Sequence, residues 1–308
     1  MTGRPDLIIL GQVTIDDVVP ALPGPWTRQM GGSSLYAIAG ARLWLEPERI
    51  GLVARVGTDY PFDLPALLAE VGLRHVALRP VASEHLVEWL IYEPDGSRRC
   101  LPRNAGLLDI GAEGSSLLQP YFDLLLAITP EAAEIPADWL PAKALHLCPQ
   151  VGPRHRDSLA YLRSRVGWIS VDPSPHYSRG LSAMELAEKL VGASALLPSA
   201  QEVRPLTTAL GDGGAALALH RAGFAEVVLK RGGDPALLAA EGSVQAVPVT
   251  AVPVVDPTGA GDSFCGAYAA CRLIGYPPAE AARRAAATAA LVVGCSGVEA
   301  ALRLARLE

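Results

Sequence analysis

The sequence has little that would suit a nucleic acid or a membrane. Its 308 residues contain 26 Lys and Arg against 32 Asp and Glu, which gives a net charge of −6 and no basic field. Nucleic acid is therefore not an expected partner. No stretch approaches the roughly 18 apolar residues of a membrane span, and the N-terminus lacks the apolar core of a signal peptide. We expect a cytoplasmic protein without a membrane partner.

Signals for disulfides, for metal clusters and for one class of kinase are also missing. The cysteines are odd in number, scattered and without a CxxC pair: Cys100, Cys148, Cys265, Cys271 and Cys295. We expect reduced thiols, with neither a disulfide framework nor a zinc site. The pattern GxxxxGK[ST] does not occur, which excludes a P-loop kinase. The run Arg154, His155 and Arg156 is interpreted as a solvated turn.

Short apolar runs alternate with amphipathic segments of helix length along most of the chain. Half of the residues are hydrophobic, so a substantial core is available. The runs are LIIL, IGLVARVG, KALHLCP, GWISVDPS, ASALLPS, AEVVLKRG and AVPVVD. This alternation predicts an α/β fold, a mainly parallel sheet with helices on both faces. No boundary is visible, so we expect a single domain over residues 1–308.

One region departs from that pattern. The stretch HLVEWLIYEPDGSRRCLP, which begins at His85, alternates in polarity around a strong turn signal at residues 94–97. Such alternation is typical of an antiparallel hairpin. We expect a small β flap attached to the main domain.

The stretch VVDPTGAGDSFCGAYAA, residues 254–270, is the most informative in the chain. It predicts a strand end, a tight turn and then a helix from Ser263 to Leu273. Gly259, Ala260 and Gly261 would lie at the helix N-terminus, where unpaired amides and the dipole attract an anion such as a phosphoryl group. Asp262 could merely complement the dipole, or it could accept the proton of a hydroxyl that attacks a phosphoryl group.

Further polar candidates follow predicted strands, where ligands collect in open parallel sheets. Asp16 closes GQVTID after the first run, and Gly31 with Gly32 opens a helical run. Glu202 lies in PSAQE, and Lys230 ends the run EVVL. Each acid or lysine alone is more typical of a loop charge. Taken together they favour a site.

These motifs together resemble those of the ribokinase/PfkB carbohydrate kinases. DPTGAGDSF, residues 256–264, is similar to the C-terminal signature of that family, and the early Asp16, the glycine pair, RVGTD and PSAQE occur in the family's order. The resemblance covers nearly the whole chain. It implies a doubly wound ribokinase-like sheet with a small β lid, formed by segments of approximately residues 12–32 and 84–104.

The resemblance also implies roles for individual residues. Asp262 would be the catalytic base, Gly259, Ala260 and Gly261 the anion hole, and Glu202 would organise Mg²⁺ through water. Residues that would hold the substrate are Asp16, Gly31, Gly32, Tyr36 and Arg103. Those that would border ATP are Lys230, Gly232, Ser296 and Gly297. A monovalent cation and a homodimer through the lid are further expectations.

Two positions depart from the family pattern, and the roles of two more stay open. Ser199 replaces the asparagine of PNxxE, and Pro235 falls where a second glycine often follows the nucleotide strand. Tyr36 occupies the last position of a GGxxxN-like element. Its ring could face a cyclic polyol or sugar, or it could pack as core. Arg103 could contact substrate or be a solvated hairpin charge.

The sequence thus predicts an ATP-dependent phosphotransferase that acts on a hydroxyl of a sugar or polyol. A cyclic polyol such as an inositol, or a hexose-sized sugar, is the expected acceptor. A nucleoside kinase is an alternative with the same chemistry. A catalytically silent nucleotide or sugar sensor is the alternative from another class.

Overall fold

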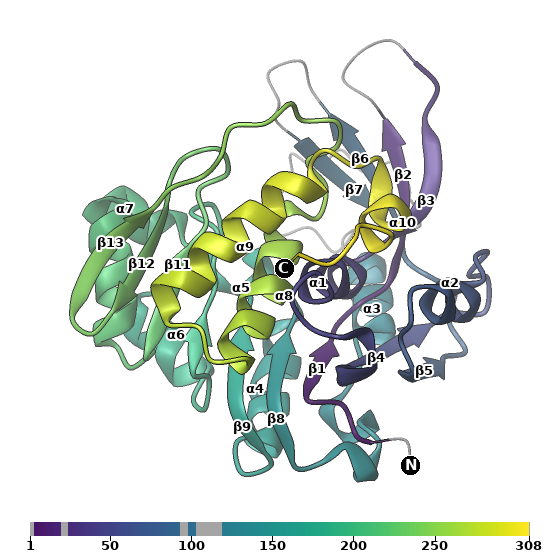
Figure 1. Ribbon diagram of the computed structural model, residues 1–308, viewed down its shortest axis with the longest axis horizontal. Helices are drawn as coiled ribbons and strands as arrows, with labels where there is room; N and C mark the ends of the chain where they lie inside the picture. The colour runs from purple at the N-terminus through teal and green to yellow at the C-terminus, as the bar shows by residue number, and fades with distance from the viewer. Residues whose placement is uncertain (1–2, 20–23, 93–97, 103–118, 308) are drawn as a thin grey trace.

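The chain forms a nine-stranded main sheet and a separate four-stranded sheet. A computed structural model describes residues 3–19, 24–92, 98–102 and 119–307. The main sheet has the order β13-β12-β11-β10-β9-β8-β1-β4-β5 (Figure 1). Its strands are β1 (Leu7–Leu10), β4 (Ile50–Val56), β5 (His75–Pro80), β8 (Ala142–Leu147), β9 (Val166–Val171), β10 (Ala195–Leu196), β11 (Glu226–Leu229), β12 (Ala236–Ala240) and β13 (Ser243–Val247). All neighbours from β5 to β11 pair in parallel, as predicted.

The winding reverses next to β1. The chain runs outward through β4 and β5 on one side, then returns to place β8, β9, β10 and β11 on the other side. The connections that follow the paired carboxyl ends of β1 and β8 therefore lead to opposite faces of the sheet, and ligands bind at such a point of reversal in open α/β sheets. Gly11 and Cys148 lie just beyond these two ends.

Helices cover both faces of the main sheet, because alternate residues of each central strand point to opposite sides. Leu7 and Ile9 pack with α1 (Ser33–Ala41), α2 (Leu64–Glu70), α8 (Ala260–Leu273), α9 (Pro278–Val292) and α10 (Gly297–Leu302). Ile8 and Leu10 pack with α4 (Gly152–Leu162), α6 (Ala183–Lys189) and α7 (Arg204–Arg221). Further helices are α3 (Gln119–Ile128) and the short α5 (Pro175–Ser178).

Two expectations about local structure are wrong. The run AVPVVD contains no strand, because Pro253 lacks the backbone donor that a ladder needs, and Val254 and Val255 are 60% and 65% exposed. The sheet is extended instead by the antiparallel hairpin of β12 and β13. The second wrong expectation is the solvated turn at residues 154–156. These residues lie in α4, and His155 is buried.

The second sheet, called the lid sheet here, has the order β3-β2-β6-β7 and lies at one end of the molecule (Figure 1). Its strands are β2 (Thr14–Val19), β3 (Thr27–Gly31), β6 (Val87–Tyr92) and β7 (Arg98–Pro102). The β6–β7 pair is antiparallel, which confirms the predicted hairpin, while its turn at residues 93–97 lies outside the described residues.

Two connectors lead from strands of the main sheet into the lid sheet. Residues 11–13 lead from β1 into β2, and residues 81–86 lead from β5 into β6. His85 links the two, because its Nε2 donates to the Val13 carbonyl at 2.9 Å while its Nδ1 accepts from the Gly57 amide at 2.9 Å. Burial lowers the pKa of His85 to about 4, so the ring stays neutral and keeps this tautomer.

Candidate active site

The turn before α8 is built to present its backbone. Gly259 is the residue before the helix and adopts φ 73°, a left-handed conformation that favours glycine, and no side chain caps the helix start. The Asp256 carboxylate accepts from the Thr258 amide at 2.9 Å and fixes the approach to the turn. The open helix N-terminus can therefore receive an anion, and Asp262 lies in the first helical turn beside it.

Close packing of α1 against α8 fixes the position of this turn. Cβ atoms added to Gly40 or Gly266 would lie 2.0 Å and 1.8 Å from backbone oxygens of the facing helix. The two helices can approach so closely only because both positions lack side chains. The starts of α1 and α8, each preceded by a glycine with positive φ, are consequently held together.

Tyr36 lies at this helix contact. Its side chain is 2% exposed, and a Cβ atom added to Gly259 would lie 2.0 Å from its Cγ atom. Its buried hydroxyl has no hydrogen-bond partner among the described residues. Burial raises the pKa of Tyr36, and the charges of Asp256, Asp16 and Asp262 raise it further. Packing thus covers the aromatic ring, while the hydroxyl lies near these three acidic side chains.

Asp16 and the glycine pair come from the lid sheet. Asp16 belongs to β2 rather than to the end of β1, and its buried carboxylate lies where a Cβ atom of Gly31 would be, 2.0 Å from Cγ. Thr14 donates to Asp16 Oδ1 at 2.7 Å. Gly32 precedes α1 with φ 106°, against the backbone of residues 12–14. The glycine pair therefore allows the chain to wrap closely around one buried acid.

Glu202 closes a tight turn after β10. Its carboxylate accepts from the Ser199 amide at 2.7 Å, and its own amide donates to Ser199 Oγ at 3.3 Å. Burial raises the pKa of Glu202 to about 8, and the nearby charge of Asp172 contributes. The serine that departs from the family pattern thus takes part in the turn through its hydroxyl.

Lys230 follows β11 and points inward. Its backbone pairs with the 198–202 turn through the Pro198 carbonyl and the Ala200 amide. Its ammonium donates to Asp172 Oδ2 at 2.6 Å and to Cys265 Sγ at 3.2 Å. Burial would lower the pKa of Lys230, but Asp172, Cys265 and Glu202 outweigh that effect and raise it. Lys230 is therefore charged.

Asp172 is the residue that sequence reasoning missed. It directly follows β9 within the run GWISVDPS, and its side chain is 3% exposed. An acid after a strand resembles a loop charge, so only the parallel order β9-β10-β11 reveals that it faces Lys230. The lone signal in the sequence was its place at the carboxyl end of a predicted strand.

The remaining candidates lie around the edge. Gly297 begins α10 with φ 74° and faces the Gln29 side chain of the lid sheet, while Ser296 before it is exposed. Gly232 is exposed with φ 62°, and no other described residue lies within 4 Å of a Cβ atom added to it. Arg103 lies outside the described residues.

The lid sheet directly contacts the turn that leads from Asp256 to Gly261 at the start of α8, called the anion turn here. The Tyr92 hydroxyl, at the end of β6, donates to Asp256 Oδ1 at 3.2 Å and also contacts Thr258 Oγ1. A residue 164 positions away in the sequence is thus brought onto the signature stretch. The lid sheet therefore lies over the turn that precedes α8.

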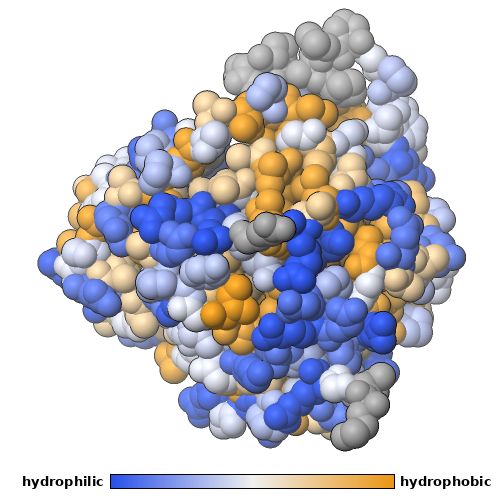
Figure 2. All heavy atoms as spheres, in the orientation of Figure 1, coloured by the Kyte–Doolittle hydropathy of each residue, from blue (hydrophilic) through white to orange (hydrophobic). Residues whose placement is uncertain are grey.

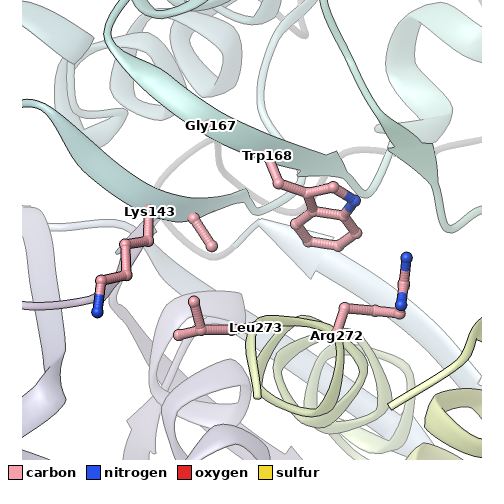
Figure 3. A pocket seen from close by; sticks show the side chains of 6 residues that line it. Lys143, Gly167, Trp168, Arg272 and Leu273 are labelled. Carbon is pink, nitrogen blue, oxygen red and sulfur yellow. The ribbon is translucent and has the colours of Figure 1, made fainter. Parts of the chain in front are cut away.

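A cavity in the described part of the chain lies away from the anion turn. It has a volume of about 420 Å³ and is lined by residues including Lys143, Trp168, Arg272 and Leu273 (Figure 3). These residues lie near the starts of β8 and β9 and the end of α8, the ends opposite the anion turn. Lys143 pairs with Asp6, and Arg272 pairs with Glu226, so both cations already have partners. This cavity is separate from the candidate site.

Comparison with known proteins agrees with this arrangement. Residues 169–304 match the model of the pfkB family of carbohydrate kinases. The C-terminal part of the chain thus resembles this family. This match and the relatives described below support a phosphotransferase with a hydroxyl acceptor, a kinase of sugar or nucleoside type.

Individual relatives extend the likeness over the whole chain. A cytidine kinase from Thermococcus kodakarensis is 28% identical over 90% of this chain and 92% of its own length. A 2-dehydro-3-deoxygluconokinase from Escherichia coli is 46% identical over 83 residues, about a quarter of either chain. The structure of a fructokinase with bound ATP from Xylella fastidiosa has a TM-score of 0.70 at 18% identity, and the match covers 96% of this chain and 94% of that one. The shared fold is thus ribokinase-like. None of the helices in the described ranges is long and apolar enough to cross a bilayer.

Proposed function

We propose that this protein transfers the γ-phosphoryl group of ATP to a hydroxyl of a sugar, polyol or related small molecule. The observation that carries the proposal is the open start of α8, where Gly259 has φ 73° and Asp262 occupies the first turn. An uncapped helix N-terminus suits the transferred phosphoryl group, and a carboxylate beside it suits the attacking hydroxyl.

In this proposal Asp262 takes or orients the proton of the acceptor hydroxyl. The amides of Gly259, Ala260 and Gly261 stabilise the charge that spreads over the transferred oxygens. Lys230, Gly232, Ser296 and Gly297 border the nucleotide. The packing of α1 on α8 fixes the amides at the start of α8, so these amides need little rearrangement as charge develops.

Kinases of this family use ATP and Mg²⁺. The residues here fit a hydrated cation rather than a direct cage. No group of three His, Cys, Asp or Glu side chains suited to a metal occurs within the described ranges, whereas the Glu202 carboxylate lies near the charged groups Asp172 and Lys230. Glu202 would hold Mg²⁺ through water. The ion would supply neutralisation of phosphate charge. A monovalent cation near the turn is a further expectation.

The acceptor would lie under the lid sheet, between Asp16, the glycine pair and Tyr36. Asp16 is an acceptor for substrate hydroxyls, and Gly31 and Gly32 let the chain wrap closely around it. The unpartnered Tyr36 hydroxyl supplies one more hydrogen bond, while Gly259 covers the ring. Arg103 stays a predicted substrate contact. Such a fixed set of polar groups favours an acceptor of hexose size, such as a hexose or an inositol.

A nucleoside acceptor is the second candidate. It is favoured by the likeness to the cytidine kinase, which extends over 90% of this chain. The single domain, its lid segments near residues 12–32 and 84–104, and pairing of two lids in a homodimer remain parts of the proposal. Closure of the lid sheet over the site would exclude water and suppress ATP hydrolysis.

One assay tests the proposal. The purified protein is incubated with ATP, Mg²⁺ and each of a panel of hexoses, inositols, ribose, sugar acids and nucleosides, and ADP release is measured. We expect acceptor-dependent ADP release, with kcat/KM highest for a hexose-sized compound. A nucleoside as the best acceptor would favour the second candidate. Bound ATP without acceptor-dependent turnover for any member would instead support a silent sensor.

A further inference from the structure

A buried cluster of three polar side chains lies directly behind the anion turn. Asp172, Lys230 and Cys265, called the Lys230 cluster here, come from the ends of β9 and β11 and from the second turn of α8. The distances are 2.6 Å from Lys230 Nζ to Asp172 Oδ2, 3.2 Å from Nζ to Cys265 Sγ, and 3.3 Å from Sγ to Oδ2. Each member thus contacts the other two.

The cluster lies close to the backbone that would receive the phosphoryl group. A Cβ atom added to Gly261 would lie 3.5 Å from Lys230 Nζ. The ammonium therefore lies beside the open helix start, and a long lysine side chain could otherwise occupy many positions there. Asp172 is the group that holds it in this position.

The cost of burying this ion pair argues for a role beyond stability. The side chains of Lys230 and Asp172 are 10% and 3% exposed, and Asp172 Oδ1 has no hydrogen-bond partner among the described residues. Removing two charges from water often costs as much as their attraction returns, so such a pair is weak evidence for stability. A fixed positive charge beside a site of developing negative charge is what preorganised catalysis needs.

We propose that Asp172 is a positioning residue of the phosphoryl-transfer site. Its carboxylate holds the Lys230 ammonium next to Gly261, so that the positive charge is already in place when charge develops on the transferred oxygens. Asp172 itself contacts neither ATP nor acceptor. The inference rests on the proposed function of the turn that begins α8, and it deepens that function by assigning the residue that acts through Lys230.

The test combines kinetics with binding. In Asp172→Asn and Asp172→Ala, Lys230 loses the carboxylate that fixes its position and raises its pKa. We expect kcat to fall about 10-fold or more, while KM for ATP stays within about 3-fold of wild type. Asp172→Glu, which retains the charge, should recover part of kcat. Lys230→Met should weaken binding of ATP but leave binding of adenosine, which has no phosphates, unchanged.

The double variant decides whether Asp172 acts through Lys230. If it does, Lys230→Met combined with Asp172→Asn is no slower than Lys230→Met alone, because the group that Asp172 positions is already gone. A matched control is Glu226→Gln, which breaks the ion pair of Glu226 with Arg272 at the other ends of β11 and α8. It should lower stability while leaving kcat and both binding constants unchanged.

Two results would overturn the proposal. One is full additivity of the two changes in kcat, and the other is a loss of thermal stability in Asp172→Asn with an unchanged kcat per folded molecule. The binding comparison of ATP with adenosine requires no acceptor. If the wild-type protein phosphorylates nothing, the proposed function fails, whereas the placement of Lys230 is still tested by whether Lys230→Met discriminates between the two ligands.

Discussion

The ring of Tyr36 occupies the space that a side chain on Gly259 would need. A Cβ atom at Gly259 would lie 2.0 Å from Tyr36 Cγ and 2.1 Å from Cδ1, and Gly259 also has φ 73°. The anion turn therefore depends on glycine for two independent reasons, its backbone conformation and the aromatic ring beside it. The same contact links the proposed acceptor residue to the proposed anion hole.

We expect Gly259→Ala to destabilise the protein and to lower turnover. Positive φ costs a non-glycine residue about 1 kcal/mol or more, and the clash with the ring adds to this cost. Chemical unfolding and kcat measure both effects. Gly233→Ala is the control, because no atom outside its neighbours lies within 4 Å of a Cβ atom there. Equal stability of the two variants would contradict the packing described for Tyr36.

Asp262→Asn should abolish most turnover without unfolding the protein. The change is nearly isosteric but removes the group that accepts the proton, and general-base catalysis typically contributes about 10²–10⁴-fold. ATP binding by calorimetry should remain within a few-fold of wild type. Near wild-type kcat in the variant would mean that Asp262 only complements the dipole of α8.

Glu202 should make the Mg²⁺ requirement depend on pH. Burial, with Asp172, raises the pKa of Glu202 to about 8, so the carboxylate is protonated below that value and becomes ionised above it. Only the ionised form attracts a hydrated cation. We expect the Mg²⁺ concentration for half-maximal activity to fall as the pH rises from 7 to 9.

Glu202→Gln is the matched variant for that titration. It should need more Mg²⁺ at every pH and lose the part of the pH dependence that arises from Glu202, while its KM for the acceptor changes little. Superimposable Mg²⁺ titrations of the variant and the wild type would remove Glu202 from the proposed metal site.

His155 should make the protein sensitive to acid. It is fully buried, its Nε2 donates to the Cys148 carbonyl at 2.8 Å, and its Nδ1 accepts from the Tyr177 hydroxyl at 2.7 Å. Burial lowers its pKa to about 4 from an ordinary value of 6.5. Between those values the unfolded chain binds a proton that the folded chain does not, so stability is lost as the pH falls from about 6.5 to 4.

Urea unfolding of wild type and His155→Gln at several pH values measures this. Within the window a proton taken up on unfolding changes the free energy of unfolding by about 1.4 kcal/mol per pH unit. We expect the wild type to show the steeper loss, with parallel curves above pH 7. Parallel curves throughout would show that His155 is not the group that titrates.

Local sequence patterns predicted most strands of the main sheet and part of the lid sheet. Six apolar runs each hold a strand of the main sheet, and alternation around residues 94–97 predicted the β6–β7 pair. These features depend on neighbours in the sequence, which pattern analysis reads directly. The strand predicted before Asp256 does not form, because the prediction gave the valines more weight than Pro253.

The parts that could not be predicted depend on tertiary neighbours. Asp172 and Lys230 are 58 residues apart and meet only through the order of β9, β10 and β11. Tyr36 could not be assigned to a ligand or to the core, because its surroundings are set by the close approach of α1 and α8.

The hydrogen bond between His85 and Val13 constrains how the lid sheet can move. The two connectors leave the main sheet from β1 and β5, on either side of β4, and His85 fastens one to the other and to Gly57 at the end of β4. Together with the direct join of β3 to α1 at Gly32, this link restricts sliding and twisting of the lid sheet relative to the main sheet. Any opening of the lid sheet would have to break the contacts of the Tyr92 hydroxyl with Asp256 and Thr258.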